Sequence, residues 1–266
     1  MNHLKVVVTS DQHLGYQNSD KASFKQFLNQ LQDDPTVTDF VLLGDVVDMW
    51  RRDASGVFFE NSDILHTVIA LTQKMNIYYV AGNHDFHVLR LQNHAYPFTF
   101  LPNLAISDGN WTYKFLHGWE FDPEQQPPLM EALCRVMSDE VGNFESGTWA
   151  TLTRDWSDTK YWLFSILSFE KNRICERAER LQINPEVRLQ NTLGSIEEKA
   201  CASVQPAEIL VFGHTHRPFV NRLENVVNSG SWVTDAAIHN TYVELIEGKP
   251  RLFVFGGQEI TDREEF

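Results

Sequence analysis

The amino-acid sequence predicts an α/β fold with a helical insertion, and three observations carry this prediction. Short apolar runs alternate with helical patterns in the first half of the chain, as expected of an α/β architecture. These runs are almost uniformly apolar, which is typical of strands covered on both faces. Strand signals stop between about residues 119 and 205, where helical patterns take over. We therefore expect one domain over residues 1–266, in which residues 119–205 form a helical insertion or cap.

Three strands and two helices are expected before residue 81. Each strand is a short apolar run that ends at a polar turn or a glycine. These strands are predicted at residues 5–9, 40–43 and 77–80. The helices show apolar residues three and four positions apart, and the second has Asn61 or Ser62 as a possible cap. They are predicted at residues 21–31 and 62–75.

The second half of the chain divides into a helical part and a return to strands. Residues 161–181 carry apolar side chains at helical spacing, and four of the seven tryptophans fall within residues 119–205. After residue 208 the pattern is again that of short apolar strands. They are predicted at residues 209–212, 226–228, 241–246 and 252–255.

The charge of the chain limits its partners. The formal net charge is -14, and no dense run of lysine and arginine is present. Because general nucleic-acid binders neutralise phosphates with a basic surface, general nucleic-acid binding is not expected. Bound divalent cations reverse the local sign, so an acidic total remains compatible with a small phosphorylated substrate.

Cysteine usage and apolar patterning indicate a cytoplasmic protein. Cys134, Cys175 and Cys201 lie far apart in helix-like stretches, which favours free thiols in a reducing compartment. The chain opens directly on a strand-like segment, without the pattern of a secretory leader. No apolar stretch reaches the roughly 18 residues that span a bilayer, so no transmembrane segment is expected. Only the acidic end of the chain, from residue 261, is expected to be disordered.

Five segments place polar residues of metal-binding type directly after an apolar run. In open α/β sheets, sites lie outside the carboxyl ends of the strands, so these segments are expected to converge. They are Thr9-Ser10-Asp11-Gln12-His13, Gly44-Asp45-Val46-Val47-Asp48, Gly82-Asn83-His84-Asp85, Leu116-His117-Gly118 and Gly213-His214-Thr215-His216.

The residue types in these segments indicate a site for two divalent ions. Aspartate, asparagine and histidine suit Mn²⁺, Fe or Zn²⁺ better than an all-oxygen calcium site, and we expect Mn²⁺ first. In an extended backbone, residues i and i+2 point to the same side, so each Asp-x-His or His-x-His pair can face one ion. A single carboxylate, Asp45, can bridge both ions. The predicted ligands are Asp11, His13, Asp45, Asn83, His117, His214 and His216.

Each segment alone has an ordinary structural explanation. Asp-x-His after a strand is often a polar turn, Gly-Asp commonly caps a helix, and an isolated His117 is more often structural than a ligand. No structural role requires all five segments in this order, so together they predict a metal site.

The five motifs together resemble the calcineurin-like metallophosphoesterase superfamily. Its motifs run D-x-H, G-D-x-x-D, G-N-H-D, G-H and G-H-x-H, and the fourth is relaxed here to Leu116-His117-Gly118. The resemblance implies a four-layer fold, in which a two-sheet β-sandwich is flanked by helices. It also implies two sets of ligands that share Asp45. One set is Asp11, His13, Asp45 and His216, and the other is Asp45, Asn83, His117 and His214.

The resemblance implies a hydrolase that cleaves a phosphomonoester, phosphodiester or pyrophosphate bond with a hydroxide activated by both ions. His84 is expected to protonate the leaving group, and Asp85 to hold the tautomer of His84. Asp48 either supports a ligand histidine or begins a helix. The candidate substrate-binding residues are Asn83, Arg51, Arg52 and His87.

Two branches of the superfamily compete for the substrate. Residues 44–50, Gly-Asp-Val-Val-Asp-Met-Trp, resemble the UDP-2,3-diacylglucosamine hydrolases, although His84 stands where those enzymes usually have arginine. That branch implies a phosphorylated substrate with an apolar or nucleotide part. Residues 11–16 instead resemble the start of DNA repair nucleases, an alternative that the acidic charge disfavours. The protein phosphatase and cyclic-nucleotide phosphodiesterase branches stay open as well, without diagnostic residues in this sequence. A metal-binding scaffold without catalysis is a further alternative.

Overall fold

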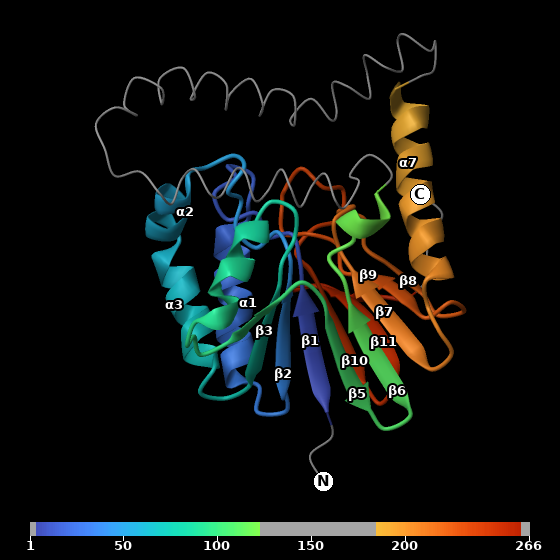
Figure 1. The fold of residues 1–266 in the computed structure, drawn as a ribbon, viewed down its shortest axis with the longest axis horizontal. Helices are drawn as coiled ribbons and strands as arrows, with labels where there is room; N and C mark the ends of the chain where they lie inside the picture. The colour runs from blue at the N-terminus through green and yellow to red at the C-terminus, as the bar shows by residue number, and fades with distance from the viewer. Residues whose placement is uncertain (1–3, 123–184, 262–266) are drawn as a thin grey trace. The chain divides into compact units, whose positions relative to one another are not determined.

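The computed structural model describes residues 4–122 and 185–261. The chain divides into two compact units, of which the first contains residues 1–121 and 199–266 and the second residues 122–198. The first, called here the β-sheet unit, holds every strand that the structure describes. Two mixed β-sheets flanked by helices form it (Figure 1), which confirms the predicted α/β sandwich.

The larger sheet has seven strands in the order β12-β11-β10-β1-β2-β3-β4. β1, β2, β3 and β4 run parallel, whereas β10, β11 and β12 are antiparallel to their neighbours. The strands are β1 (Lys5–Thr9), β2 (Asp39–Leu43), β3 (Asn76–Val80), β4 (Thr99–Leu101), β10 (Thr241–Ile246), β11 (Lys249–Val254) and β12 (Glu259–Ile260).

The smaller sheet has five strands in the order β5-β6-β7-β9-β8. Its central strands β6, β7 and β9 are parallel, and β5 and β8 close its edges in antiparallel pairing. The strands are β5 (Leu104–Asp108), β6 (Trp111–Phe115), β7 (Glu208–Phe212), β8 (Phe219–Asn221) and β9 (Val226–Asn228).

Alternate residues of the strands fill two separate apolar clusters. On β1, Val6 and Val8 join side chains of both sheets, including Tyr113 and Val211 of the smaller one. Val7 points to the opposite face and joins the cluster that contains the side chains of the helices. This alternation is the period of two that a strand imposes on its side chains, and it explains why β1 is apolar throughout.

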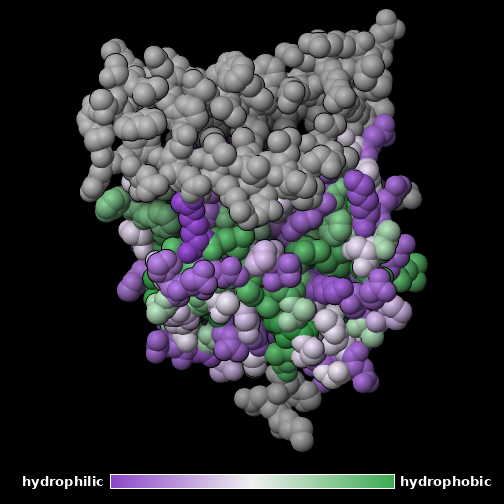
Figure 2. Space-filling model, viewed as in Figure 1, coloured by the Kyte–Doolittle hydropathy of each residue, from purple (hydrophilic) through white to green (hydrophobic). Residues whose placement is uncertain are grey.

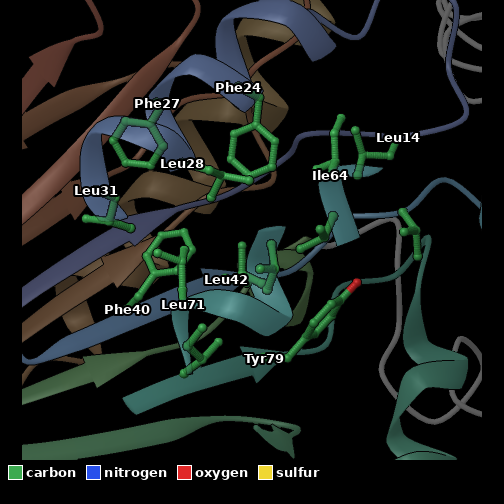
Figure 3. Packing of buried hydrophobic residues seen from close by; sticks show 14 of the residues in the cluster. Leu14, Phe24, Phe27, Leu28, Leu31, Phe40, Leu42, Ile64, Leu71 and Tyr79 are labelled. Carbon is green, nitrogen blue, oxygen red and sulfur yellow. The ribbon is translucent and has the colours of Figure 1, made fainter. Parts of the chain in front are cut away.

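Helices α1 (Lys21–Asp33), α2 (Ala54–Glu60) and α3 (Ser62–Leu71) belong to the β-sheet unit. α1 begins where Asp20 accepts a hydrogen bond from the backbone N–H of Ser23 at 3.1 Å. It buries the apolar stripe that predicted it, and Figure 3 shows this stripe facing strand residues such as Phe40 and Leu42. The buried residues of that stripe are Phe24, Phe27, Leu28 and Leu31.

Most of the expected elements are present with shifted ends. The predicted helix at residues 62–75 stops at Leu71, because residues 72–75 form a turn before β3. The strand expected at residues 252–255 instead begins at Lys249. Among the described α-helices and strands, α2, β4, β5, β6, β8 and β12 were not predicted.

The expected insertion at residues 119–205 falls largely outside the described residues, which exclude 123–184, and it stays a prediction. The same holds for the helix expected at residues 161–181 and for the acidic end beyond residue 261. Within 119–205 the structure describes the short 3-10 helix η2 (Trp119–Phe121) and α7 (Pro185–Ala202), in which the half-buried Cys201 is a free thiol. None of the described helices is long and apolar enough to cross a bilayer. Polar and apolar residues intermingle on the face of the described part that Figure 2 shows.

Candidate metal centre

Each of the five polar segments directly follows a strand, as predicted. The first three follow neighbouring parallel strands of the larger sheet, and the other two follow neighbouring parallel strands of the smaller sheet. In Figure 1 these strands end on the same side of the β-sheet unit. The strands end at Thr9, Leu43, Val80, Phe115 and Phe212.

Five of the seven predicted ligands adopt a left-handed backbone conformation. Their φ angles are 56° at Asp11, 48° at His13, 52° at Asp45, 65° at His214 and 55° at His216. The extended backbone expected for the Asp-x-His and His-x-His pairs is therefore wrong, and tight turns bring these side chains together. Non-glycine residues rarely adopt positive φ, and such strain concentrates at functional sites.

The two carboxylates are oriented in the same way. A backbone N–H holds one oxygen of each: His214 N–H donates to Asp11 Oδ2 at 2.9 Å, and His84 N–H donates to Asp45 Oδ1 at 2.8 Å. Each carboxylate is buried, and its second oxygen lies near histidine Nε2 atoms. The backbone thus fixes both carboxylates with one oxygen available to a ligand.

Glycines in the motifs permit this close approach. A Cβ atom at Gly82 would lie 2.2 Å from Asp45 Oδ1, and one at Gly213 would lie 2.3 Å from Asp11 Oδ2. Real Cβ atoms do not come so close to another atom. Only a residue without a side chain allows these turns to pack so closely against the carboxylates, which explains the glycines.

Imidazole nitrogens converge on the remaining carboxylate oxygens. His117 Nε2 lies 3.3 Å from Asp45 Oδ2 and 3.8 Å from Asp11 Oδ1. His216 Nε2 lies 3.1 Å from Asp11 Oδ1, and His13 Nε2 lies 3.7 Å from each carboxylate. His13 and His216 also face each other, with 3.1 Å between their Nε2 atoms. Three groups of described residues have ligand atoms within 4.8 Å of one another: Asp11 with His13 and His216, Asp45 with His117 and His214, and Asp48 with His13 and His84.

These side chains fit a divalent cation. Asp11 Oδ1 and His117 Nε2 are buried and form no hydrogen bond within the described residues, which is costly unless another partner compensates. The other ring nitrogen, Nδ1, is hydrogen-bonded in two of these histidines. His117 Nδ1 donates to Leu43 O at 2.9 Å, and His13 Nδ1 donates to Asp48 at 3.0 Å. Such outer contacts typically aim the other nitrogen at a metal ion.

The electrostatics of the site also favour a cation. Burial lowers the pKa of His13, but Asp11 and Asp48 outweigh burial and raise it to about 10. In the same way, Asp45 and Asp11 overcome burial and raise the pKa of His117 well above its usual value. The carboxylates thus create a negative potential that holds protons on buried imidazoles, and a divalent ion would displace those protons on binding.

Asp48 connects two histidines. Its Oδ2 accepts from His13 Nδ1 and its Oδ1 from His84 Nδ1, both at 3.0 Å. Oδ1 also accepts from the backbone N–H of Trp50 and Arg51, so the same carboxylate shapes the turn that follows. Of the two roles left open for Asp48, support of a histidine is therefore the one that the geometry favours.

The expected role of Asp85 as the partner of His84 is wrong. The Asp85 carboxylate accepts from the backbone N–H of Gly82 at 2.7 Å, from that of Val46 at 2.8 Å and from Tyr79 Oη at 2.6 Å. Asp85 therefore ties the loop after β2 to the loop after β3. It stands next to His84 in the sequence, but Asp48 is the residue that contacts the imidazole.

The candidate substrate-binding residues are placed differently. Arg51 forms an ion pair with Asp48, and its guanidinium lies 4.5 Å from the centroid of the Tyr16 ring. Arg52 instead pairs with the exposed carboxylates of Asp53 and Glu60. The geometry therefore favours Arg51 over Arg52 as a residue beside the site. Two further candidates lie after β3, Asn83 in the loop and His87 in the 3-10 helix η1 (Phe86–Asn93).

Comparison with known proteins decides the family. The family model described as calcineurin-like phosphoesterase matches residues 4–218, which is most of the chain. The chain belongs to the calcineurin-like phosphoesterase family. It is therefore a hydrolase of a metal-dependent family that acts on small phosphorylated substrates.

Two relatives extend over nearly the whole of this phosphoesterase. A UDP-2,3-diacylglucosamine hydrolase of Shewanella piezotolerans is 24% identical over 261 residues, which are 92% of this chain and 98% of the relative. The solved structure of Yfce, a phosphoesterase from E. coli, has a TM-score of 0.50 at 15% identity and covers 97% of both chains. This similarity supports the fold described above.

Proposed function

We propose that this phosphoesterase hydrolyses its substrate at two divalent ions, with Mn²⁺ preferred. Asp11, His13, Asp45 and His216 would hold one ion, and Asp45, Asn83, His117 and His214 the other. The observation that carries the proposal is the convergence of the Nε2 atoms of the buried His117 and the half-buried His216 on Asp11 Oδ1 and Asp45 Oδ2. Two ions bound in this way lower the pKa of water and neutralise the charge of the phosphoryl oxygens.

The protein residues would orient the reaction. Asn83 lies in the same loop as His84, and its amide is suited to hold a phosphoryl oxygen. His84 Nδ1 donates to the Asp48 carboxylate, which orients the ring and favours its protonated form, with Nε2 4.0 Å from Asp45 Oδ2. As the imidazolium, which carries a proton on each ring nitrogen, His84 would donate the Nε2 proton to the leaving oxygen and would be left as the neutral ring with its proton on Nδ1.

For the substrate, we propose a nucleoside diphosphate linked to an acylated sugar, cleaved at its pyrophosphate bond. The relative named UDP-2,3-diacylglucosamine hydrolase matches this chain over almost its whole length. Residues 44–50 carry the Gly-Asp-x-x-Asp-x-Trp pattern of that branch.

The proposal is tested by an activity screen with added Mn²⁺. We expect turnover of a generic aryl phosphodiester, and faster turnover of nucleoside diphosphate sugars that carry acyl chains than of those without them. Phosphomonoesters and single-stranded DNA complete the panel. Preference for single-stranded DNA would contradict the proposed substrate, and no turnover of any phosphoester with metal bound would contradict catalysis.

Replacement of Asp48 by asparagine is expected to weaken metal binding and turnover together. An amide cannot accept from both His13 Nδ1 and His84 Nδ1, so at least one ring loses its support. Loss of such a supporting contact typically costs about 10- to 100-fold in metal affinity or activity. Metal titration and steady-state kinetics measure both effects.

Asp53→Asn is the matched control for this substitution. Asp53 lies five positions further on, is exposed and caps α2 by accepting from Gly56 N–H at 2.8 Å. Because asparagine caps helices about as well as aspartate, metal affinity and turnover should not change. Equal affinity and activity in Asp48→Asn and the wild type would show that Asp48 does not support the histidines.

A further inference from the structure

Trp50 makes a close ring contact with His84. The indole and the imidazole are stacked, with 4.2 Å between ring centroids and 26° between ring planes. Among the described residues, neither apolar cluster includes Trp50, whereas its neighbour Met49 packs against one of them. Trp50 is also only half-buried. A tryptophan with this placement covers His84 and contributes little to the core.

The turn after β2 sets this contact. Asp48 Oδ1 accepts from the backbone N–H of Trp50 at 3.2 Å and of Arg51 at 2.9 Å, so the turn is built around the carboxylate that also binds His84. The next side chain, Arg51, turns to the ring of Tyr16. The indole of Trp50 therefore reaches the face of the imidazole whose Nδ1 is already held.

The hydrogen bond to Asp48 alone does not fix the orientation of the His84 ring. A single contact at Nδ1 fixes the distance to Asp48 but allows the ring to tilt about that contact. The stacked indole bears on one face of the His84 ring, and the rings of His84 and His13 form a T-shaped contact with 4.8 Å between centroids and an interplanar angle of 88°. These two ring contacts restrict the tilt. They fix the direction in which Nε2 points.

We propose that Trp50 is a positioning residue, whose indole holds the imidazole of His84 in the orientation that directs Nε2 at the leaving oxygen. This inference rests on the proposed function of His84. A small misplacement of a reacting group is costly, and about 1 Å can lower a rate by roughly 100-fold. In the proposed reaction, the bond between phosphorus and the leaving oxygen breaks as His84 Nε2 delivers its proton to that oxygen. In this role Trp50 contacts His84 and does not contact the substrate.

The orientation is tested without turnover by NMR of histidine side chains. The metal-loaded protein is prepared with diamagnetic Mg²⁺ and labelled histidine, and the His84 signals are assigned from their loss in His84→Gln. A stacked indole shifts the ring protons of His84 upfield. We expect this shift to vanish in Trp50→Leu and to remain in part in Trp50→Phe. Unchanged His84 signals in Trp50→Leu would overturn the inference.

Kinetics test whether that orientation matters for proton donation. With a poor leaving group such as an alkyl alcohol, Trp50→Leu should lower kcat roughly 10- to 100-fold and leave KM and metal content unchanged. With p-nitrophenolate, which needs little protonation, the loss should be much smaller. Trp50→Phe should retain most of the activity. Trp111→Leu, a half-buried tryptophan at the start of β6, is the matched control and should behave as the wild type with both leaving groups.

A double variant separates positioning from other roles. If Trp50 acts through His84, adding Trp50→Leu to His84→Ala lowers kcat no further. A further loss in the double variant would assign Trp50 an independent role, and a raised KM with unchanged kcat would assign it to substrate binding. Either result overturns the inference. Absence of activity in the wild type would refute the proposed function alone, because the NMR experiment still decides whether Trp50 orients His84.

Discussion

Asp45→Asn is expected to lower kcat by about 10³-fold or more and to reduce the metal content of the purified protein. Asp45 Oδ2 lies 3.3 Å from His117 Nε2 and 3.7 Å from His13 Nε2, so it stands between the proposed ligand sets. A neutral amide keeps the shape of the side chain but loses the charge that would serve both ions. A 10³-fold lower rate corresponds to the loss of about 4 kcal/mol of transition-state stabilisation, which is within what bound metal ions contribute.

Asp39→Asn provides the matched control for this prediction. Asp39 begins the strand that Asp45 follows, is equally buried, and accepts from Asn76 Nδ2 at 3.0 Å. The same substitution there removes a buried charge far from the polar loops, and asparagine can still accept that hydrogen bond. We expect normal metal content and turnover in Asp39→Asn. Substantial metal-dependent activity in Asp45→Asn would contradict the assignment of Asp45 as the shared ligand.

The position of the site was predictable because its segments follow recognisable strands. β1, β2, β3 and β7 are short apolar runs, and parallel strands bring their carboxyl ends to one edge. The edge strand β5 was missed because Leu104–Asp108 alternates half-buried and exposed residues, so it carries no continuous apolar run. α2 was missed because seven residues with a glycine give a weak helical signal.

The local geometry of the site could not be predicted in the same way. The left-handed φ of Asp11 and His13 depends on turns held by the loop after β2: Gly44 O accepts from Asp11 N–H at 3.0 Å, and Asp45 O accepts from His13 N–H at 2.8 Å. A pattern of residue types contains no information on such pairings. It predicted that the side chains converge, and the reason it gave, an extended backbone, was wrong.

The error over Asp85 has a related cause. Adjacency in the sequence suggested that Asp85 holds His84, but successive residues in a tight loop point in different directions. Asp85 turns inward to Tyr79 and to backbone N–H groups, whereas Asp48 approaches His84 from 36 positions earlier in the chain. The donors to Asp85 come from β3 and from the loops after β2 and β3, and the pairing of these two strands brings them together. The sequence does not indicate this pairing.

His84→Ala is expected to lower kcat by about 10²- to 10⁴-fold for substrates with poor leaving groups, the range typical of general acid catalysis. The backbone N–H of residue 84 donates to Asp45 Oδ1 and remains in the alanine variant, so the carboxylate keeps its orientation. Metal content should therefore stay normal. For p-nitrophenyl esters the loss should be much smaller, since that leaving group departs without a proton.

His94→Ala is the control for removing an imidazole from this region, because His94 is exposed just after η1 and should be dispensable. Steady-state kinetics over a series of leaving groups, with metal analysis of each variant, separates the outcomes. A loss in His84→Ala that is equal for all leaving groups would assign His84 to stabilising the phosphoryl charge. A loss that grows as the leaving group becomes more basic would assign it to proton donation, and Asp48 and Trp50 would then act by orienting that proton.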